Sequence, residues 1–183
     1  MHRRQIKYQN IQIQIIDSAR SVKTSFMTQK IIKGLELLAE ELAHLLFAEN
    51  QNSLNLDRQR IEGVELTITF CGQQHIRQLN TKYRQKNKIT DVLSFALHAD
   101  LRNSKKTNGH FALKKLNLGD IVICREVAKR QSLEFEIPLY SEVLHLALHG
   151  MLHLCGYDHE QGGKEQKIME WLEDFYIRRL IKK

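Results

Sequence analysis

Runs of alternating apolar and polar residues, separated by a longer run with helical spacing, constrain most strongly how this chain of 183 residues can fold. Residues 11–15 and 64–70 alternate with a period of two, which predicts two strands that each bury one face. Between them, residues 28–48 place apolar side chains three and four positions apart, which predicts a long amphipathic helix. Helices and strands are therefore interleaved, as in folds where helices cover a sheet.

Further strands and helices are predicted after residue 70. A short helix is expected over residues 75–83, and residues 91–97 and 116–124 predict a third and a fourth strand. The rest of the chain, from Arg125 onward, has helical character, and its one proline, Pro138, stands near a helix start. The prediction is an α+β (mixed α/β) fold in which a small four-stranded sheet packs against several helices.

Length and composition favour one soluble domain over residues 1–183, since 42% of the residues are hydrophobic and 27% are charged. No apolar run approaches the roughly 18 residues of a membrane span, and the polar residues 5–14 cannot form the apolar part of a signal peptide. Cys71, Cys124 and Cys155 are odd in number and lack CxxC spacing, which suits small buried side chains in a reducing cytoplasm.

The positive charge is concentrated in one part of the sequence. The formal net charge is +7, and between residues 82 and 115 nine basic residues face only two acidic ones. Such an excess is typical of a surface that binds a polyanion, although a solvated loop that aids solubility would look the same. Residues 98–115 are polar, basic and long for a loop, so we expect them to be mobile, and we expect residues 1–10 to be flexible.

The histidines His149, His153 and His159 carry the clearest chemical signal. The first two lie on consecutive turns of one predicted helix, so they share a face. Gly156 stands where a left-handed C-cap would end that helix and let the chain return with His159. One histidine on an apolar helix is usually a core residue, but three at this spacing can converge on a metal. Three imidazoles leave the fourth zinc position open for water, as in catalytic sites, so we expect one Zn²⁺ per chain.

The residues around this trio narrow the class of enzyme. His145 lies one turn before His149, and we interpret it as a packing residue or as a group that orients a ligand. The histidine spacing also matches the metalloprotease pattern His-Glu-x-x-His-x-x-Gly-x-x-His, but Gly150 stands in the place of the glutamate. That glutamate is the general base of peptide hydrolysis, so its absence disfavours a peptidase.

Residues 149–159, HGMLHLCGYDH, closely resemble the signature of the YbeY family of bacterial metal-dependent endoribonucleases. Two upstream blocks are also similar to that family, residues 79–95 (LNTKYRQKNKITDVLSF) and 118–124 (LGDIVIC). The chain departs from the family pattern at Ala96, where proline is frequent, and at Cys155, where an apolar residue is usual. We expect neither position to touch the chemistry.

The resemblance implies that the three histidines bind zinc and that Arg84 lines the same cleft, with Arg84 and His149 as the catalytic residues. Without the resemblance, Arg84 would be interpreted as part of a surface salt bridge. The implied activity is that of a single-strand-specific, zinc-dependent endoribonuclease, a phosphodiester hydrolase, in ribosomal RNA maturation at the 16S rRNA 3′ end and in ribosome quality control. The implied partners are single-stranded RNA, ribosomal RNA and the small ribosomal subunit with its proteins, and no membrane.

Other residues are weaker candidates. Those that could orient a ligand histidine or a water, or equally cap a turn or end a strand, are Asp91, Ser94, Asp120 and Asp158. Basic residues that could hold the RNA backbone are Lys82, Lys86, Lys88, Arg102, Lys105, Lys106, Lys114 and Lys115. Tyr83 and Phe95 could stack on bases, or could belong to the core.

Two other functions stay open from the sequence. One is a non-catalytic, zinc-stabilised, RNA-binding ribosome-assembly factor, in which the metal holds the fold and the basic face binds RNA. The other is a metal hydrolase of a small molecule or peptide, which Gly150 and the concentrated positive charge disfavour.

Overall fold

The structure is a computed structural model that describes residues 1–18, 26–48, 54, 56, 61–98, 101–102, 114–159 and 162–182. The chain order of the elements is β1-β2-α1-β3-α2-β4-β5-α3-α4-α5. The strands are β1 (His2–Tyr8), β2 (Ile11–Asp17), β3 (Gly63–Cys71), β4 (Val92–Ala96) and β5 (Lys115–Cys124). The helices are α1 (Gln29–Phe47), α2 (Gln73–Arg84), α3 (Arg125–Glu134), α4 (Leu139–Leu154) and α5 (Gly163–Lys182).

The strands form one sheet in the order β1-β2-β3-β5-β4. The three central strands β2, β3 and β5 run parallel, and β1 and β4 pair antiparallel at the two edges. The parallel strands need crossovers, which α1 supplies between β2 and β3. Strand β4 lies beside β5 with Phe95 opposite Asp120. This edge of the sheet forms one wall of the candidate site.

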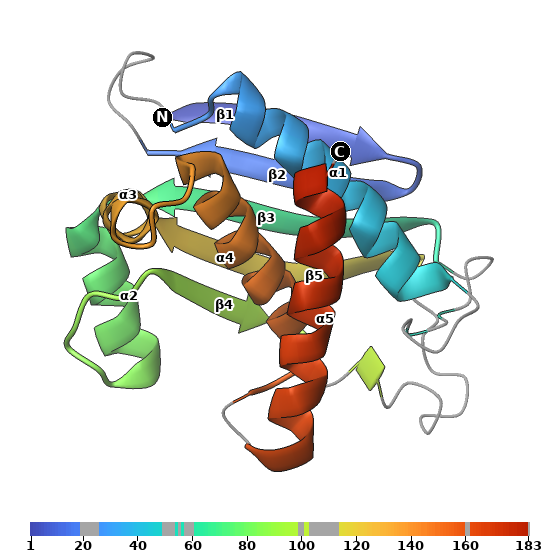
Figure 1. Ribbon diagram of the computed structural model, residues 1–183. Coiled ribbons are helices and arrows are strands. Elements are labelled where there is room, and N and C mark those ends of the chain that lie inside the picture. The colour runs from blue at the N-terminus through green and yellow to red at the C-terminus, as the bar shows by residue number, and fades with distance from the viewer. Residues whose placement is uncertain are drawn as a thin grey trace.

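Helices α1, α4 and α5 cover one face of the sheet, and α2 and α3 lie at the end where β3 and β5 finish (Figure 1). The largest core cluster joins the apolar side chains of β2, β3 and β5 to those of α1 and α4. Ile11, Ile13 and Ile15 of β2 are fully buried, as the alternating pattern predicts. Helix α4 packs against β4 and β5 and also against α1, α3 and α5, which fixes the side chains that it carries.

The mixed α/β fold is confirmed, with one strand more than predicted. The predicted long helix matches α1 closely, and the Thr28 hydroxyl accepts a hydrogen bond from the Ile31 N–H, as an N-cap does. The expectation that residues 1–10 are flexible is wrong, because residues 2–8 form β1. This strand escaped the sequence pattern because Ile6 is its one buried residue: backbone pairing with β2 holds it at an exposed edge.

The expected mobile loop at residues 98–115 falls largely outside the described residues. Leu101 and Arg102 are described, and both are anchored: Leu101 is fully buried, and Arg102 forms an ion pair with Glu165 of α5. Lys115 already belongs to β5. The three cysteines are buried and free, as expected. Within the described ranges, no helix has the length and apolarity that crossing a membrane requires.

Candidate active site

The end of helix α4 brings the histidine block back on itself. Gly156 has a φ of 92°, in the left-handed region that glycine adopts at little cost. The Gly156 N–H donates to the His153 carbonyl at 3.0 Å, and the Tyr157 N–H donates to the Leu152 carbonyl at 3.1 Å. This pair of bonds is a Schellman motif, and it reverses the chain so that His159 returns beside the helix.

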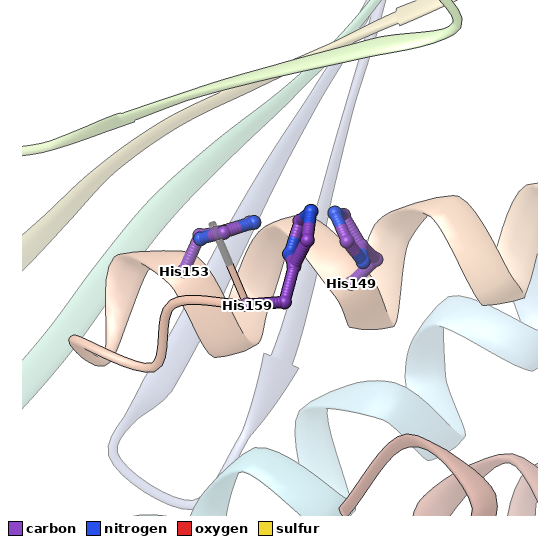
Figure 2. Close-up of side chains that lie close together, drawn as sticks. All are labelled: His149, His153 and His159. Carbon is purple, nitrogen blue, oxygen red and sulfur yellow. The ribbon is translucent and has the colours of Figure 1, made fainter. Parts of the chain in front are cut away.

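The three predicted ligands meet in space (Figure 2). His149 and His153 project from consecutive turns of α4, and His159 comes from the returning segment. Their ring centroids lie 4.7 to 5.1 Å apart, and one nitrogen from each ring lies within 4.8 Å of the others. The predicted grouping is therefore present, and His145 is not part of it.

Glu173 of α5 contacts the trio from outside, although no sequence pattern pointed to this residue. Its Oε1 lies 2.6 Å from Nδ1 of His149, and both side chains are mostly buried. Burial would raise the pKa of Glu173, but the hydrogen bond to His149 and the positive charge of the nearby histidines lower it overall. An ionised carboxylate accepts a hydrogen bond, so this contact places the proton on Nδ1 of His149 and leaves the Nε2 lone pair for a ligand.

Helix α5 is itself fixed against the rest of the fold. Arg179, two turns after Glu173, donates through Nε to the buried Glu41 carboxylate of α1 at 2.8 Å. The ion pair between Arg102 and Glu165 holds the start of the same helix. The carboxylate that contacts His149 is therefore positioned by packing rather than by a mobile side chain alone.

The electrostatics of the trio suit a bound cation. Burial first, and then the neighbouring His149 and His159, lower the pKa of His153 to about 4, so its imidazole is neutral near pH 7. Nδ1 of His159 is buried and has no hydrogen-bond partner among the residues that the structure describes. Neutral imidazoles with lone pairs are the form that binds metals. Three converging imidazole nitrogens, one of them oriented by a carboxylate, fit the donor set of zinc.

Gly150 allows α4 to lie against the sheet at this point. A Cβ at this position would lie 2.7 Å from Cγ2 of Ile121 on β5 and 3.0 Å from Oγ of Ser94 on β4. A larger side chain would force the helix away from both strands. The glutamate that a metalloprotease carries at this position has no room here, which agrees with the expectation that the chain is not such a peptidase.

The trio lies in a cleft of about 830 Å³ between α4 and the edge strand β4. Arg84, the last residue of α2, lines the same cleft, as the resemblance implied. Gln85 ends α2 in the left-handed conformation, and the buried Asn80 donates to the Lys88 carbonyl at 2.8 Å. These contacts fold the segment after α2 back on the helix and set the position of Arg84.

The weaker candidates divide between the cleft and the rest of the surface. Four of them line the cleft: His145, Asp91, Ser94 and Asp158. The Asp91 carboxylate accepts hydrogen bonds from Gln131, Thr90 and the Val92 N–H, which together lower its pKa although burial would raise it. Its role is to join β4 to α3. Asp120 is exposed and does not line the cleft, because its neighbour Ile121 faces α4.

The basic candidates that the structure describes do not form one patch. Lys82, Lys86 and Lys88 are exposed at the end of α2, beside the cleft residue Arg84. Arg102 is bound to Glu165 and lies over the ring of Tyr157, at 5.0 Å from its centroid. Lys114, just before β5, forms an ion pair with Glu62, just before β3. Lys115, the first residue of β5, forms an ion pair with Glu65 of β3. Lys105 and Lys106 lie outside the described residues.

Known proteins resemble this chain over most of its length. Residues 12–181 match the family model described as endoribonuclease YbeY. A protein from Aquifex aeolicus with the name endoribonuclease YbeY is 39% identical over 134 residues, which are 73% of this chain and 82% of that protein. Its namesake from Sulfurihydrogenibium is 34% identical over 153 residues, 84% of this chain and 93% of that protein.

The fold has also been seen before. The solution structure of TM1509 from Thermotoga maritima superposes with a TM-score of 0.54 at 24% identity, and the match covers 92% of this chain and 88% of that one. At this identity the likeness supports the fold alone. The family match, which spans nearly the whole chain, and the identity to its named members carry the assignment: the chain belongs to the endoribonuclease YbeY family.

Proposed function

We propose that this chain is a metal-dependent endoribonuclease that cleaves single-stranded RNA during ribosomal RNA maturation. The observation that carries the proposal is that three converging histidines and Arg84 line one cleft. The names of the family members agree with the activity, since they are endoribonucleases. They do not favour the non-catalytic assembly factor, which remains an outcome of the experiments below.

The ion that we propose for the site is one Zn²⁺, held by His149, His153 and His159. A zinc ion bound by three imidazoles supplies a Lewis acid for a phosphoryl oxygen. With its proton on Nδ1, toward Glu173, His149 keeps its Nε2 lone pair for the ion. The lowered pKa of His153 keeps a second lone pair available near neutral pH.

Arg84 is the residue that we propose to act on the substrate directly. It reaches the cleft from α2, whereas His149 and His153 reach it from α4. A guanidinium is always charged, and its planar set of donors fits two phosphate oxygens. In this position it would bind the phosphodiester and stabilise the negative charge that grows on its oxygens in the transition state.

The path of the RNA follows from where exposed basic residues adjoin the cleft. Lys82, Lys86 and Lys88 continue from Arg84 along the exposed end of α2, so we propose that they hold the backbone on that side of the cleft. Lys114 and Lys115 pair with glutamates at the far end of β5 and are assigned no such role. The specific substrate that we propose is the 3′ end of 16S rRNA, on or near the small ribosomal subunit in the cytoplasm.

The experiment that tests this function compares Arg84→Ala with Arg4→Ala for cleavage of a single-stranded ribosomal RNA fragment. Arg4 is an exposed arginine on β1, at the opposite edge of the sheet from β4, so its replacement removes the same charge away from the cleft. We expect Arg84→Ala to lose about 100-fold or more in kcat, in the range found when one transition-state donor is removed, with its metal retained. Equal cleavage by both variants would refute the role of Arg84.

The same samples decide between the enzyme and the assembly factor. Weaker RNA binding by Arg84→Ala, with no cleavage by the metal-loaded wild type, would favour the assembly factor. Hydrolysis of a chromogenic ester or a peptide that greatly exceeds that of RNA would favour a different hydrolase.

A further inference from the structure

An exposed aromatic ring stands at the mouth of the cleft. Tyr83 is 56% exposed, although its ring is large and apolar, and it lines the cleft beside Arg84. Phe95 of β4 also lines the cleft, and its ring centroid is 5.1 Å from that of Tyr83 at an interplanar angle of 65°. Phe95 packs against the smaller core cluster of α2, β4, β5 and α3, so it supports the Tyr83 ring from below.

The position of this pair relates it to the chemistry. Tyr83 and Arg84 are consecutive residues at the end of α2, and both face the cavity that holds the histidine trio. A phosphodiester held by Arg84 would have its attached base within reach of the neighbouring ring. The aromatic pair is therefore placed to contact a base next to the scissile bond rather than a distant part of the RNA.

The charge around Tyr83 fits a nucleotide. The Lys82 ammonium lies 4.8 Å from the centroid of the Tyr83 ring. A cation in that position can attract the phosphates on either side of a base that lies on the ring. An aromatic face next to a basic strip is the combination that proteins use to bind single-stranded nucleic acid, with each stacked base adding to the affinity.

Exposure alone does not identify such a site, as Trp171 shows. This side chain is 49% exposed on α5 and stacks on Phe175 at 5.3 Å between centroids. It does not line the cleft, so it provides a control of the same chemical kind.

We propose that Tyr83, supported by Phe95, stacks on one nucleobase of single-stranded RNA beside the phosphodiester that Arg84 binds. The proposal rests on the proposed function and gives that site a base-binding position. Within a duplex both faces of each base are covered by its neighbours, so a stacking position favours single strands and unpaired ends. All four bases have an aromatic face, so the position selects for an unpaired base and is tolerant of its identity.

The test measures binding and not cleavage. A fluorescent single-stranded oligonucleotide with 2′-O-methyl riboses, checked on a gel for integrity, is titrated with the metal-loaded protein and followed by anisotropy. We expect Tyr83→Ala to weaken binding about 5- to 100-fold, which is the effect of losing one stacked base. Tyr83→Phe keeps the ring and should bind within about twofold of wild type, and Trp171→Ala should bind as wild type does.

A second series replaces one base at a time with an abasic nucleotide. At the stacked position, and there alone, the abasic strand should bind wild type and Tyr83→Ala equally, because the contact is already lost. If Tyr83→Ala weakens binding by the same factor at every abasic position, the stacking proposal is wrong, and so it is if Tyr83→Phe behaves like Tyr83→Ala. No binding of any single strand by the wild type would overturn the proposed function as well; binding without cleavage of natural RNA would overturn the nuclease and leave the stacking position standing.

Discussion

Replacing Glu173 should weaken metal binding by the histidine trio while the protein stays folded. Its carboxylate accepts a hydrogen bond from Nδ1 of His149 over 2.6 Å, and it is 20% exposed, so solvent replaces it poorly. A hydrogen bond to a charged group contributes about 1.5–3 kcal/mol. Loss of a group that hydrogen-bonds a metal-binding histidine typically costs about 10–100-fold in metal affinity, or about 1.4–2.8 kcal/mol. This cost agrees with the energy of the hydrogen bond.

Two replacements of Glu173 separate geometry from charge. Glu173→Gln keeps an oxygen that can accept the hydrogen bond, so His149 keeps its tautomer and the loss of zinc affinity should be about tenfold or less. Glu173→Ala removes the acceptor, so the loss should approach about 100-fold. Glu170→Gln is the matched control, because Glu170 lies on the same helix and accepts instead from Gln166.

Zinc affinity is measured by competition calorimetry with a chelator, and the His149 tautomer by ¹⁵N NMR of the metal-free protein. We expect one tautomer with Nδ1 protonated in wild type and in Glu173→Gln, and a mixture in Glu173→Ala. The reasoning fails if Glu173→Ala binds zinc as tightly as Glu170→Gln, or if its His149 tautomer is unchanged.

Three further perturbations test the fold and the site. Gly150→Ala should lower the free energy of unfolding in urea, because overpacking costs about 1–3 kcal/mol and the gain in helix propensity is at most about 1 kcal/mol. Gly72→Ala is the control, because the nearest described atom to its new Cβ would be 3.6 Å away. If Gly150→Ala leaves the free energy of unfolding unchanged, α4 moves freely at this contact. Burial raises the pKa of Glu142, so the unfolded chain loses this proton at a lower pH than the folded one, and stability falls as the pH rises above about 4.5. Glu142→Gln should therefore be more stable than wild type at pH 7 and equally stable at pH 4. If the two proteins differ in stability by the same amount at both pH values, ionisation of Glu142 is not the cause. A chelator should lower the melting temperature of wild type and leave that of His153→Ala unchanged; equal shifts would place the metal elsewhere.

The grouping of the three histidines could be predicted because their geometry is local. Two of them share one helix face, and Gly156 fixes the turn that returns the third, so eleven residues determine the whole group. Glu173 is separated from His149 by 24 positions and lies on another helix, so no periodicity relates the two. Its place depends on how α5 packs on α1 and α4, which only the tertiary structure determines.

Strand β1 and Asp120 show two different limits of sequence patterns. An exposed edge strand buries almost nothing, so β1 has no alternation to detect, and its pairing comes from backbone groups that every residue carries. Asp120 stands in a strand that was predicted, but the sequence does not say which face of that strand meets α4. Once Ile121 is seen against Gly150, the alternation of the strand directs Asp120 to the opposite face.

The central claim is that the histidine trio holds a metal on which RNA cleavage depends. The most direct test measures zinc content and cleavage of a single-stranded ribosomal RNA fragment on the same samples of wild type and His153→Ala, before metal removal, after it, and after zinc is restored. We predict about one zinc per wild-type chain, cleavage that disappears and returns with the metal, and neither metal nor cleavage in His153→Ala. Undiminished cleavage by metal-free wild type, or by His153→Ala, would contradict the account.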